Sequence, residues 1–400
     1  MGKQLLEGIR VLDFTQYLAG PYCSMFLADM GAEVIKVENL KSRGDFVRGT
    51  PPKEKKTGNS MYFANLNRNK KDVCLNLKTE EGKELFAKLV KSADVLVENM
   101  RPGVIAKLGF SYENCKALNP GLIFTSISGF GQYGPYSSRP GFDLIAQAMG
   151  GSMSVTGWPG EEPTRAGIAI GDIMSGMNAC IGILASLVKK KETGLGQQID
   201  VALVDSIVSS LESKAMQYIY EGKVPEKEGN KYIASAPYDS FTAKDDYFVI
   251  ASGTDLHFKA LSAVIGQPEL ADNPLYKTTE DRKVNAKTLK EIINKWASNK
   301  TVSECVDAIL GAGVPAAPIY NAKDIYEDKN ISEVREMFVK VKDPEAGEIT
   351  ILGNPIKMSE YPCQYKTSAP KLGEHDNEIF EQLGYSREKL DEYRSKGALI

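Results

Sequence analysis

The stretch that decides the fold is residues 9–38, IRVLDFTQYLAGPYCSMFLADMGAEVIKVE. Residues 9–14 form a short apolar run typical of a buried strand, and a loop containing glycine and proline follows it. Residues 22–30 then carry apolar side chains at helical spacing, and after a glycine residues 33–38 again have the character of a strand. The stretch therefore predicts a strand–helix–strand unit with two parallel strands.

The same alternation continues along the first half of the chain. Residues 79–92 begin with threonine and two glutamates, which favour a helix N-terminus, and place apolar side chains on one face. Strands that alternate with helices indicate a doubly wound α/β domain with a parallel sheet. Further strands are predicted at 72–77, 94–98 and 122–128, and a short helix at 111–118.

The second half predicts a smaller α+β domain. Residues 221–230 are charged and interrupted by glycine and proline, which is typical of a linker. We therefore divide the chain into a large domain at 1–220 and a small domain with its linkers at 221–329. Within the small domain we expect a strand at 247–252 and helices at 256–265 and 288–298. Outside it we expect a long helix at 173–191, a strand pair at 339–353, and a frayed, charged end at 389–400.

Composition and charge exclude several classes of protein. With 42% hydrophobic and 25% charged residues, the chain has the proportions of a soluble globular protein. The 49 basic and 52 acidic residues leave a net charge of −3, so we expect neither nucleic acid nor a membrane as partner. Six scattered cysteines without a Cys-x-x-Cys pair, and only two histidines, predict no metal site. The N-terminus lacks the apolar stretch of a signal peptide, so we expect a cytoplasmic protein.

Residues 129–134, GFGQYG, match the G-x-G-x-x-G pattern of dinucleotide-binding loops and follow a predicted strand. That pattern requires a helix directly after it, whereas a polar stretch with two prolines follows here. The better interpretation is a flexible glycine loop at the carboxyl edge of the sheet, where α/β proteins bind ligands.

The segment 169–177, AIGDIMSGM, is the most informative about chemistry. Asp172 follows an apolar stretch and precedes a helix with small side chains at Ser175, Gly176 and Ala179. One interpretation is structural, with Asp172 as the cap that accepts the first free N–H groups of the helix. The other is catalytic, because a helix N-terminus favours an ionised carboxylate, the form that attacks as a nucleophile.

Basic residues cluster after the early predicted strands. Most lysines lie on a solvated face, but at the ligand-binding edge of a parallel sheet such residues would suit a phosphorylated ligand. The set comprises Lys36, Lys41, Arg43, Lys70, Lys71, Lys78, Arg101 and Lys107.

Seven short motifs stand in order along nearly the whole chain. They are LEGIRVLDFT (6–15), AGP (19–21), LADMGAEVIKVE (27–38), NRNKK (67–71), DVLVENMRPG (94–103), GDIMSGM (171–177) and GNPIK (353–357). Together they resemble the class III CoA-transferases, the family of the formyl-CoA:oxalate and crotonobetainyl-CoA:carnitine CoA-transferases. The resemblance is specific to the superfamily and not to one substrate.

The resemblance implies a fold and a reaction. The fold is a Rossmann-like large domain at 1–220 completed by 330–400, a smaller domain, and two identical subunits interlocked like links of a chain. Asp172 matches the family's nucleophile, whose carboxylate attacks an acyl-CoA thioester to form an aspartyl anhydride and then an aspartyl-CoA thioester. CoA then passes to an acceptor carboxylate. No metal or prosthetic group is needed, so coenzyme A and acyl-CoA are expected as substrates, with no tightly bound cofactor.

The same resemblance assigns further site residues. Gln16, Leu18 and Phe142 match positions of the substrate pocket. Formyl-CoA transferases carry glutamine where this chain has Leu18, and a run of glycines where only Gly253 is comparable, so a formyl/oxalate specificity is not expected. Five residues match positions that touch CoA: Lys78, Asn99, Met100, Arg101 and Lys107.

Two other functions stay open. The related α-methylacyl-CoA racemases use a histidine and an acid to exchange a proton beside the thioester, and that histidine would fall at Phe142, whose ring carries no exchangeable proton. The second alternative is a catalytically silent CoA-binding protein in which Asp172 only caps a helix. The sequence does not identify the acceptor acid, for which Arg48 and Arg165 are candidate partners of a second carboxylate.

Overall fold

The protein is described by a computed structural model over residues 4–400. These residues form two compact units, each with a hydrophobic core of its own. The first unit comprises the chain up to Ser154, residues 165–224 and residues 330–400. The second comprises residues 155–164 and 225–329. The first unit therefore draws on both halves of the chain.

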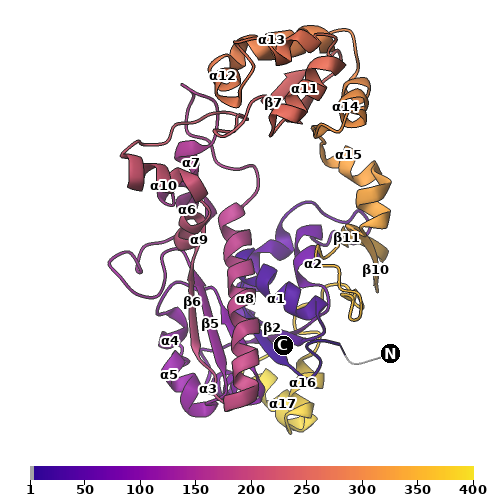
Figure 1. Cartoon of the computed structure of the whole chain (residues 1–400). Coiled ribbons are helices and arrows are strands. Elements are labelled where there is room, and N and C mark those ends of the chain that lie inside the picture. The colour runs from indigo at the N-terminus through magenta and orange to yellow at the C-terminus, as the bar shows by residue number, and fades with distance from the viewer. Residues whose placement is uncertain (1–3) are drawn as a thin grey trace. The chain divides into compact units, whose positions relative to one another are not determined.

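The first unit is built around a six-stranded sheet in which every neighbouring pair of strands is parallel (Figure 1). The predicted α/β fold with a parallel sheet is thus confirmed. The strand order is β3-β2-β1-β4-β5-β6, so the direction of winding reverses between β1 and β4. Doubly wound sheets bind ligands in the crevice at that reversal. The strands are β1 (Arg10–Phe14), β2 (Glu33–Asn39), β3 (Lys70–Leu75), β4 (Val95–Glu98), β5 (Ile123–Ser128) and β6 (Gln198–Ala202).

Helices cover both faces of this sheet, which explains why its strands are apolar on both sides. One face packs against α3 (Glu80–Ser92) and α5 (Tyr112–Leu118), which with the sheet form a core around Phe86 and Phe124. Thr79 accepts the N–H of Gly82 as the N-cap of α3, and two glutamates follow in the first turn, as the sequence predicts.

The other face is covered by α1 (Ala19–Asp29) and α8 (Ile170–Thr193), which contact each other and lie beside the sheet in Figure 1. Their approach is close because α8 carries glycine at position 176. A Cβ atom built on Gly176 would lie 2.6 Å from the carbonyl oxygen of Ala19. The small residues of this helix therefore let another backbone approach, as expected from the sequence.

Helix α8 is longer than the predicted helix at 173–191. Among residues 4–400 it is the one helix that length and composition would allow to span a membrane. Its apolar side chains Cys180, Ile183 and Leu187 are buried in the core shared with α1 and the sheet. The helix therefore belongs to the layer that covers the sheet.

The C-terminal segment is part of the core, so the expectation of a frayed end at 389–400 is wrong. Helices α16 (Asp376–Gln382) and α17 (Arg387–Ser395) pack into the core that contains α3. Leu399, 2% exposed, forms an isolated bridge with Leu75 at the end of β3. Although α17 is mostly charged, its side chains Leu390 and Tyr393 are buried in this core.

Shorter elements complete the first unit. The strand pair predicted at 339–353 is the antiparallel pair β10 (Phe338–Asp343) and β11 (Gly347–Leu352). The remaining elements are the short helices η1 (Leu40–Ser42), η2 (Phe46–Gly49), α2 (Met61–Asn67), α4 (Val104–Lys107), α6 (Asp143–Met149), α7 (Ser152–Val155), α9 (Leu203–Ser209), α10 (Glu212–Glu221) and η4 (Asn330–Val334).

The second unit contains a three-stranded antiparallel sheet and helices around a core that includes Phe241, Phe248 and Phe258. The strand and helices predicted for this region are present as β8 (Tyr247–Ala251), α11 (Asp255–Val264) and α13 (Ala286–Ala297). The other elements are β7 (Tyr238–Thr242), η3 (Pro268–Ala271), α12 (Thr279–Val284), α14 (Val302–Gly311), β9 (Ala316–Pro318) and α15 (Ala322–Glu327).

Candidate active site

A cavity of about 550 Å³ lies at the reversal of the sheet, where the loops after β1 and β4 meet. Two hydrogen bonds join these loops. The N–H of Gln16 donates to Oδ1 of Asn99 over 2.9 Å, and Nδ2 of Asn99 donates to the carbonyl of Gln16 over 2.6 Å. The Gln16 side chain also reaches Sδ of Met100 at 3.6 Å. These contacts give the floor of the cavity a defined shape.

Most of the residues singled out from the sequence line this cavity together. Lys78 and Lys107 are not among its lining residues and are exposed, in the loop after β3 and at the end of α4. The predicted residues that the structure brings to the cavity are Gln16, Leu18, Asn99, Met100, Arg101, Phe142 and Asp172.

Asp172 lies in the first turn of α8 and is not its cap. The N-cap position belongs to Ala169, and no side chain of that residue caps the helix. Instead, the N–H of Gly171 donates to Oδ1 of Asp143 on α6 over 2.8 Å. The structural interpretation of Asp172 is therefore wrong, because the capping carboxylate comes from another helix and leaves the Asp172 side chain to the cavity.

The environment of Asp172 favours its protonated form more than its place on the helix suggests. Burial and, to a smaller extent, the nearby charge of Asp143 together raise the pKa of the Asp172 carboxyl to about 7. The sequence argument considered only the helix N-terminus, which favours the charged form. A carboxylate with this pKa is partly ionised at neutral pH and more basic than an ordinary aspartate, which suits a nucleophile.

Asp143 and Gln147 were not singled out by the sequence analysis. Gln147 is fully buried, and its Nε2 donates to Oδ2 of Asp143 over 2.7 Å while its Oε1 accepts the N–H of Ala166 over 2.8 Å. The two side chains therefore tie α6 to the segment that leads into α8. The only local signal is the i, i+4 spacing of Asp143 and Gln147, which is too common to identify a site.

Aromatic rings form one wall of the cavity. The ring of Tyr17 lies 5.9 Å from that of Phe46 and 6.0 Å from that of Phe142, the latter edge to face. Phe142, the position to which the resemblance assigns the racemase histidine, thus lines the cavity. Neither His257 nor His375 is among the residues that line the cavity.

Two arginines, Arg101 and Arg139, line the cavity, and neither forms an ion pair within residues 4–400. The arginines proposed from the sequence do not join them. Arg48 is bound to Glu38 and Asp72, and Arg165 is exposed. The expectation that Arg48 or Arg165 holds a carboxylate in this cavity is not supported by their positions.

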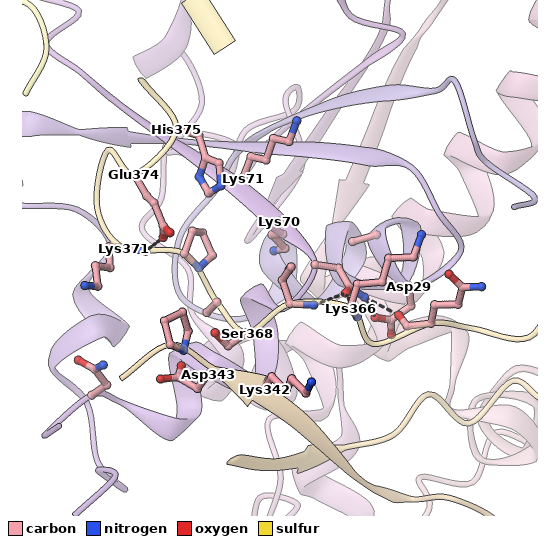
Figure 2. A pocket seen from close by; sticks show the side chains of 18 of the residues that line it. Asp29, Lys70, Lys71, Lys342, Asp343, Lys366, Ser368, Lys371, Glu374 and His375 are labelled. Carbon is pink, nitrogen blue, oxygen red and sulfur yellow. Dashed lines mark hydrogen bonds between the residues drawn. The ribbon is translucent and has the colours of Figure 1, made fainter. Parts of the chain in front are cut away.

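A second cavity, of about 410 Å³, lies at the opposite, amino edge of the sheet (Figure 2). Lys70 and Lys71 stand at the start of β3, so the prediction that they follow a strand at the ligand-binding edge is wrong. Lys70 is bound to buried Asp13, and Lys71 forms ion pairs with Glu33 and Glu378. Because these lysines are already neutralised, we assign the chemistry to the cavity that contains Asp172.

The glycine-rich loop at 129–134 does not have the structure of a dinucleotide-binding loop. Residues 129–134 lead into turns, and α6 begins only at Asp143, so the dinucleotide-binding pattern lacks its helix. Gly129 instead contributes to the lining of the cavity with Asp172.

In the part of the chain that the structure describes, no three His, Cys, Asp or Glu side chains are grouped as metal ligands would be.

Comparison with known proteins gives a consistent result. A sequence model described as CoA-transferase family III matches residues 6–376. The chain is 41% identical over 389 residues to succinyl-CoA:mesaconate CoA-transferase of Haloarcula marismortui, covering 95% of this chain and 96% of that protein. It is 37% identical over 393 residues to succinyl-CoA–D-citramalate CoA-transferase of Chloroflexus aurantiacus, covering 98% and 97%. A solved CAIB/BAIF family protein from Brucella suis superimposes with a TM-score of 0.86 at 36% identity, over 96% of this chain and 100% of that one.

A doubly wound α/β enzyme with a half-buried carboxylate facing a cavity at its topological switch point is the class that fold and site define. Within that class, the chain belongs to CoA-transferase family III, and it is a class III CoA-transferase. Its relatives act on CoA thioesters and carboxylic acids, as their names state.

Proposed function

We propose that this enzyme transfers CoA from an acyl-CoA to a carboxylic acid through covalent intermediates on Asp172. The Asp172 carboxylate attacks the thioester carbonyl and expels CoA thiolate, which leaves a mixed anhydride. The thiolate then attacks the aspartyl carbonyl of the anhydride and expels the donor acid, giving an aspartyl-CoA thioester. The acceptor carboxylate and CoA repeat both steps in reverse order, so the thioester is conserved and no metal or prosthetic group takes part.

The position of the Asp172 carboxyl in the cavity carries this proposal. With a pKa of about 7, a large fraction of this carboxyl is ionised at neutral pH. Its carboxylate is also more basic than that of an ordinary aspartate. The aromatic wall and the apolar side chains around it limit the water that would hydrolyse an anhydride. Lys78, Arg101 and Lys107, on loops and helix ends at the carboxyl edge, are proposed to hold the phosphates of CoA.

The test is to mix the enzyme with succinyl-CoA, trap with hydroxylamine and analyse the peptide that contains Asp172 by mass spectrometry. We expect a hydroxamate at Asp172, and no modification and no turnover in Asp172→Ala. Turnover retained in Asp172→Ala would rule out the covalent mechanism. CoA binding without exchange in the wild type would instead favour a silent CoA-binding protein. Deuterium uptake beside the thioester would favour a racemase.

We further propose that the acceptor is a dicarboxylic acid. Relatives act on mesaconate, citramalate and glutarate, according to their names. In this chain Arg139 offers an unpaired guanidinium in the cavity, stacked at 3.7 Å over the ring of Tyr136, which can bind the carboxylate that does not react.

Matched acids test this specificity. We expect Arg139→Met to raise KM for glutarate about tenfold or more, while the already weak use of valerate stays unchanged. Equal effects on the two acids would remove Arg139 from recognition of a second carboxylate. Mutation of Arg165, which does not line the cavity, provides the control.

We also propose a cytoplasmic homodimer, as the family resemblance implies. One face of α8 supports an interface: Met177, Ile181 and Val188 are 45%, 63% and 65% exposed and follow one another at helical spacing. Light scattering should give the mass of a dimer, and Ile181→Lys should shift it towards the monomer. A wild-type monomer at micromolar concentration would contradict this proposal.

A further inference from the structure

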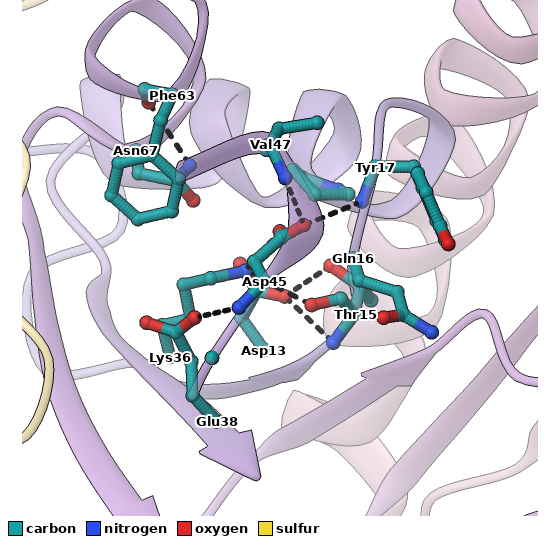
Figure 3. Close-up of polar contacts among 12 residues, drawn as sticks. Asp13, Thr15, Gln16, Tyr17, Lys36, Glu38, Asp45, Val47, Phe63 and Asn67 are labelled. Carbon is teal, nitrogen blue, oxygen red and sulfur yellow. Dashed lines mark hydrogen bonds and ion pairs between the residues drawn. The ribbon is translucent and has the colours of Figure 1, made fainter. Parts of the chain in front are cut away.

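The side chain of Asp45 joins two segments that form the aromatic wall of the cavity (Figure 3). Its Oδ1 accepts the N–H of Tyr17 over 3.2 Å and the N–H of Val47 over 3.2 Å. Tyr17 belongs to the loop after β1, and Val47 to the short helix η2. One carboxylate oxygen therefore sets the spacing between these two segments.

Asp45 is itself held by buried partners. Its Oδ2 lies 3.1 Å from Nζ of Lys36, and both side chains are almost completely buried. Lys36 also donates to the carbonyl of Thr15 over 2.9 Å, and Glu38 accepts the N–H of Asp45. Because β2 carries both Lys36 and Glu38, the carboxylate is anchored to the sheet, and the wall is anchored through it.

The wall needs such an anchor. Tyr17 has a φ of +66°, a left-handed conformation that is unfavourable for a bulky side chain unless its surroundings hold it. Its ring touches Phe46, the neighbour of Val47, and also Phe142. Phe46 and Phe142 are 70% and 60% exposed, so little apart from these ring contacts and the backbone fixes their position.

We propose that Asp45 is a positioning residue that holds the Tyr17 and Phe46 rings over the cavity, so that the acyl chain is confined between this wall and Asp172. This inference rests on the proposed covalent function of Asp172. Asp45 does not touch the reacting atoms and acts through the amides of Tyr17 and Val47. Loss of these two hydrogen bonds would free the wall and leave the nucleophile itself intact.

Two double variants separate this role from the buried charge. Lys36→Met with Asp45→Asn removes both charges and keeps a side-chain oxygen that accepts the two amides. Lys36→Met with Asp45→Leu removes the same charges and the acceptor as well. The pair therefore differs in hydrogen bonding to Tyr17 and Val47 and not in net charge, and circular dichroism confirms that each variant is folded.

The first measurement is hydrogen exchange, read by mass spectrometry on peptides that contain Tyr17 and Val47. We expect slow exchange at both amides in the wild type and in the asparagine variant, and fast exchange in the leucine variant. Wild-type amides that exchange as fast as those of an exposed loop would overturn the proposal, even if neither variant folds.

The second measurement is the kinetics of CoA transfer. The leucine variant is expected to show a KM for the acceptor about tenfold to a hundredfold above that of the asparagine variant, with trapping of the acyl group at Asp172 still observed. Equal KM values in the two variants would refute the positioning role. Failure to trap an acyl group at Asp172 in the wild type would instead refute the proposed function, so the two failures are distinguishable.

Discussion

Replacing Asp172 by asparagine should abolish turnover and at the same time make the protein more stable at neutral and alkaline pH. The carboxyl group has its pKa raised from 3.8 to about 7, first by burial and then by the charge of Asp143. A charge that is less favourable in the folded than in the unfolded state opposes folding. The amide of asparagine has nearly the same shape and carries no charge, so it removes that opposition.

The size of the effect follows from the two pKa values. A folded-state pKa above the unfolded value means that the native state binds more protons between pH 4 and 7, so stability falls as pH rises through this range. At about 1.4 kcal/mol per pKa unit, ionisation of Asp172 opposes folding by about 2 kcal/mol at pH 5 and about 4 kcal/mol at pH 8. The gain from Asp172→Asn should therefore be about 2–3 kcal/mol larger at pH 8 than at pH 5.

Urea denaturation of both proteins at pH 5 and pH 8, at one protein concentration, measures this difference. Glu360→Gln changes the net charge equally at an exposed position and serves as the control, with no pH-dependent gain expected. A gain that is the same at both pH values, or a loss of stability at pH 8, would refute the argument that burial raises the pKa of Asp172.

Three further outcomes are expected. The rate of acyl loading on Asp172 should rise with pH to a plateau with a midpoint near 7. In stopped-flow profiles Asp143→Asn should lower that midpoint, because it removes the neighbouring charge. An unmoved midpoint would exclude Asp143 as a cause of the raised pKa of Asp172. Leu399→Ala should lower the free energy of unfolding by about 2–5 kcal/mol, as expected for a buried leucine, and a change below about 1 kcal/mol would show that the C-terminal segment is peripheral. Arg68→Met leaves the buried carboxylate of Asp29 without its ion-pair partner and should destabilise the protein by about 3–5 kcal/mol. Lys83→Met breaks an exposed ion pair with Glu80 and should change stability by less than about 1 kcal/mol. Similar losses of stability for the two variants in thermal unfolding would contradict the role given to burial.

Much of the fold could be predicted because its signals are local. The apolar run at 9–14 and the capped, amphipathic segment at 79–92 correspond to β1 and α3 within a few residues. The segment at 389–400 could not be predicted in the same way. Its charged residues indicate a solvated end, and Ala398 and Leu399 become buried only because the folded chain brings this segment against the end of β3.

The candidate site was predicted in part for the same reason. Asp172 was singled out from its place at the start of a predicted helix, whereas Gln16 and Asn99 were assigned only through the family resemblance. The two latter residues follow predicted strands, and the topology of a parallel sheet brings such positions to one edge. Lys70 was misplaced because β3 begins two residues earlier than the predicted strand, which moves this residue from a neighbouring loop to the buried start of the strand.

The sequence by itself determined the parallel α/β architecture, the family to which its motifs point, and Asp172 as the residue to examine, since periodicity, capping residues and short motifs are properties of neighbouring positions. The tertiary structure decided how that carboxyl behaves. Asp143 accepts a hydrogen bond from the N–H of Gly171, which lies 28 positions along the chain. The burial that raises the pKa of Asp172 comes from helices and loops that meet only in the folded protein. Solvation and the distances between distant charges are set by packing, and no local pattern of residues encodes them.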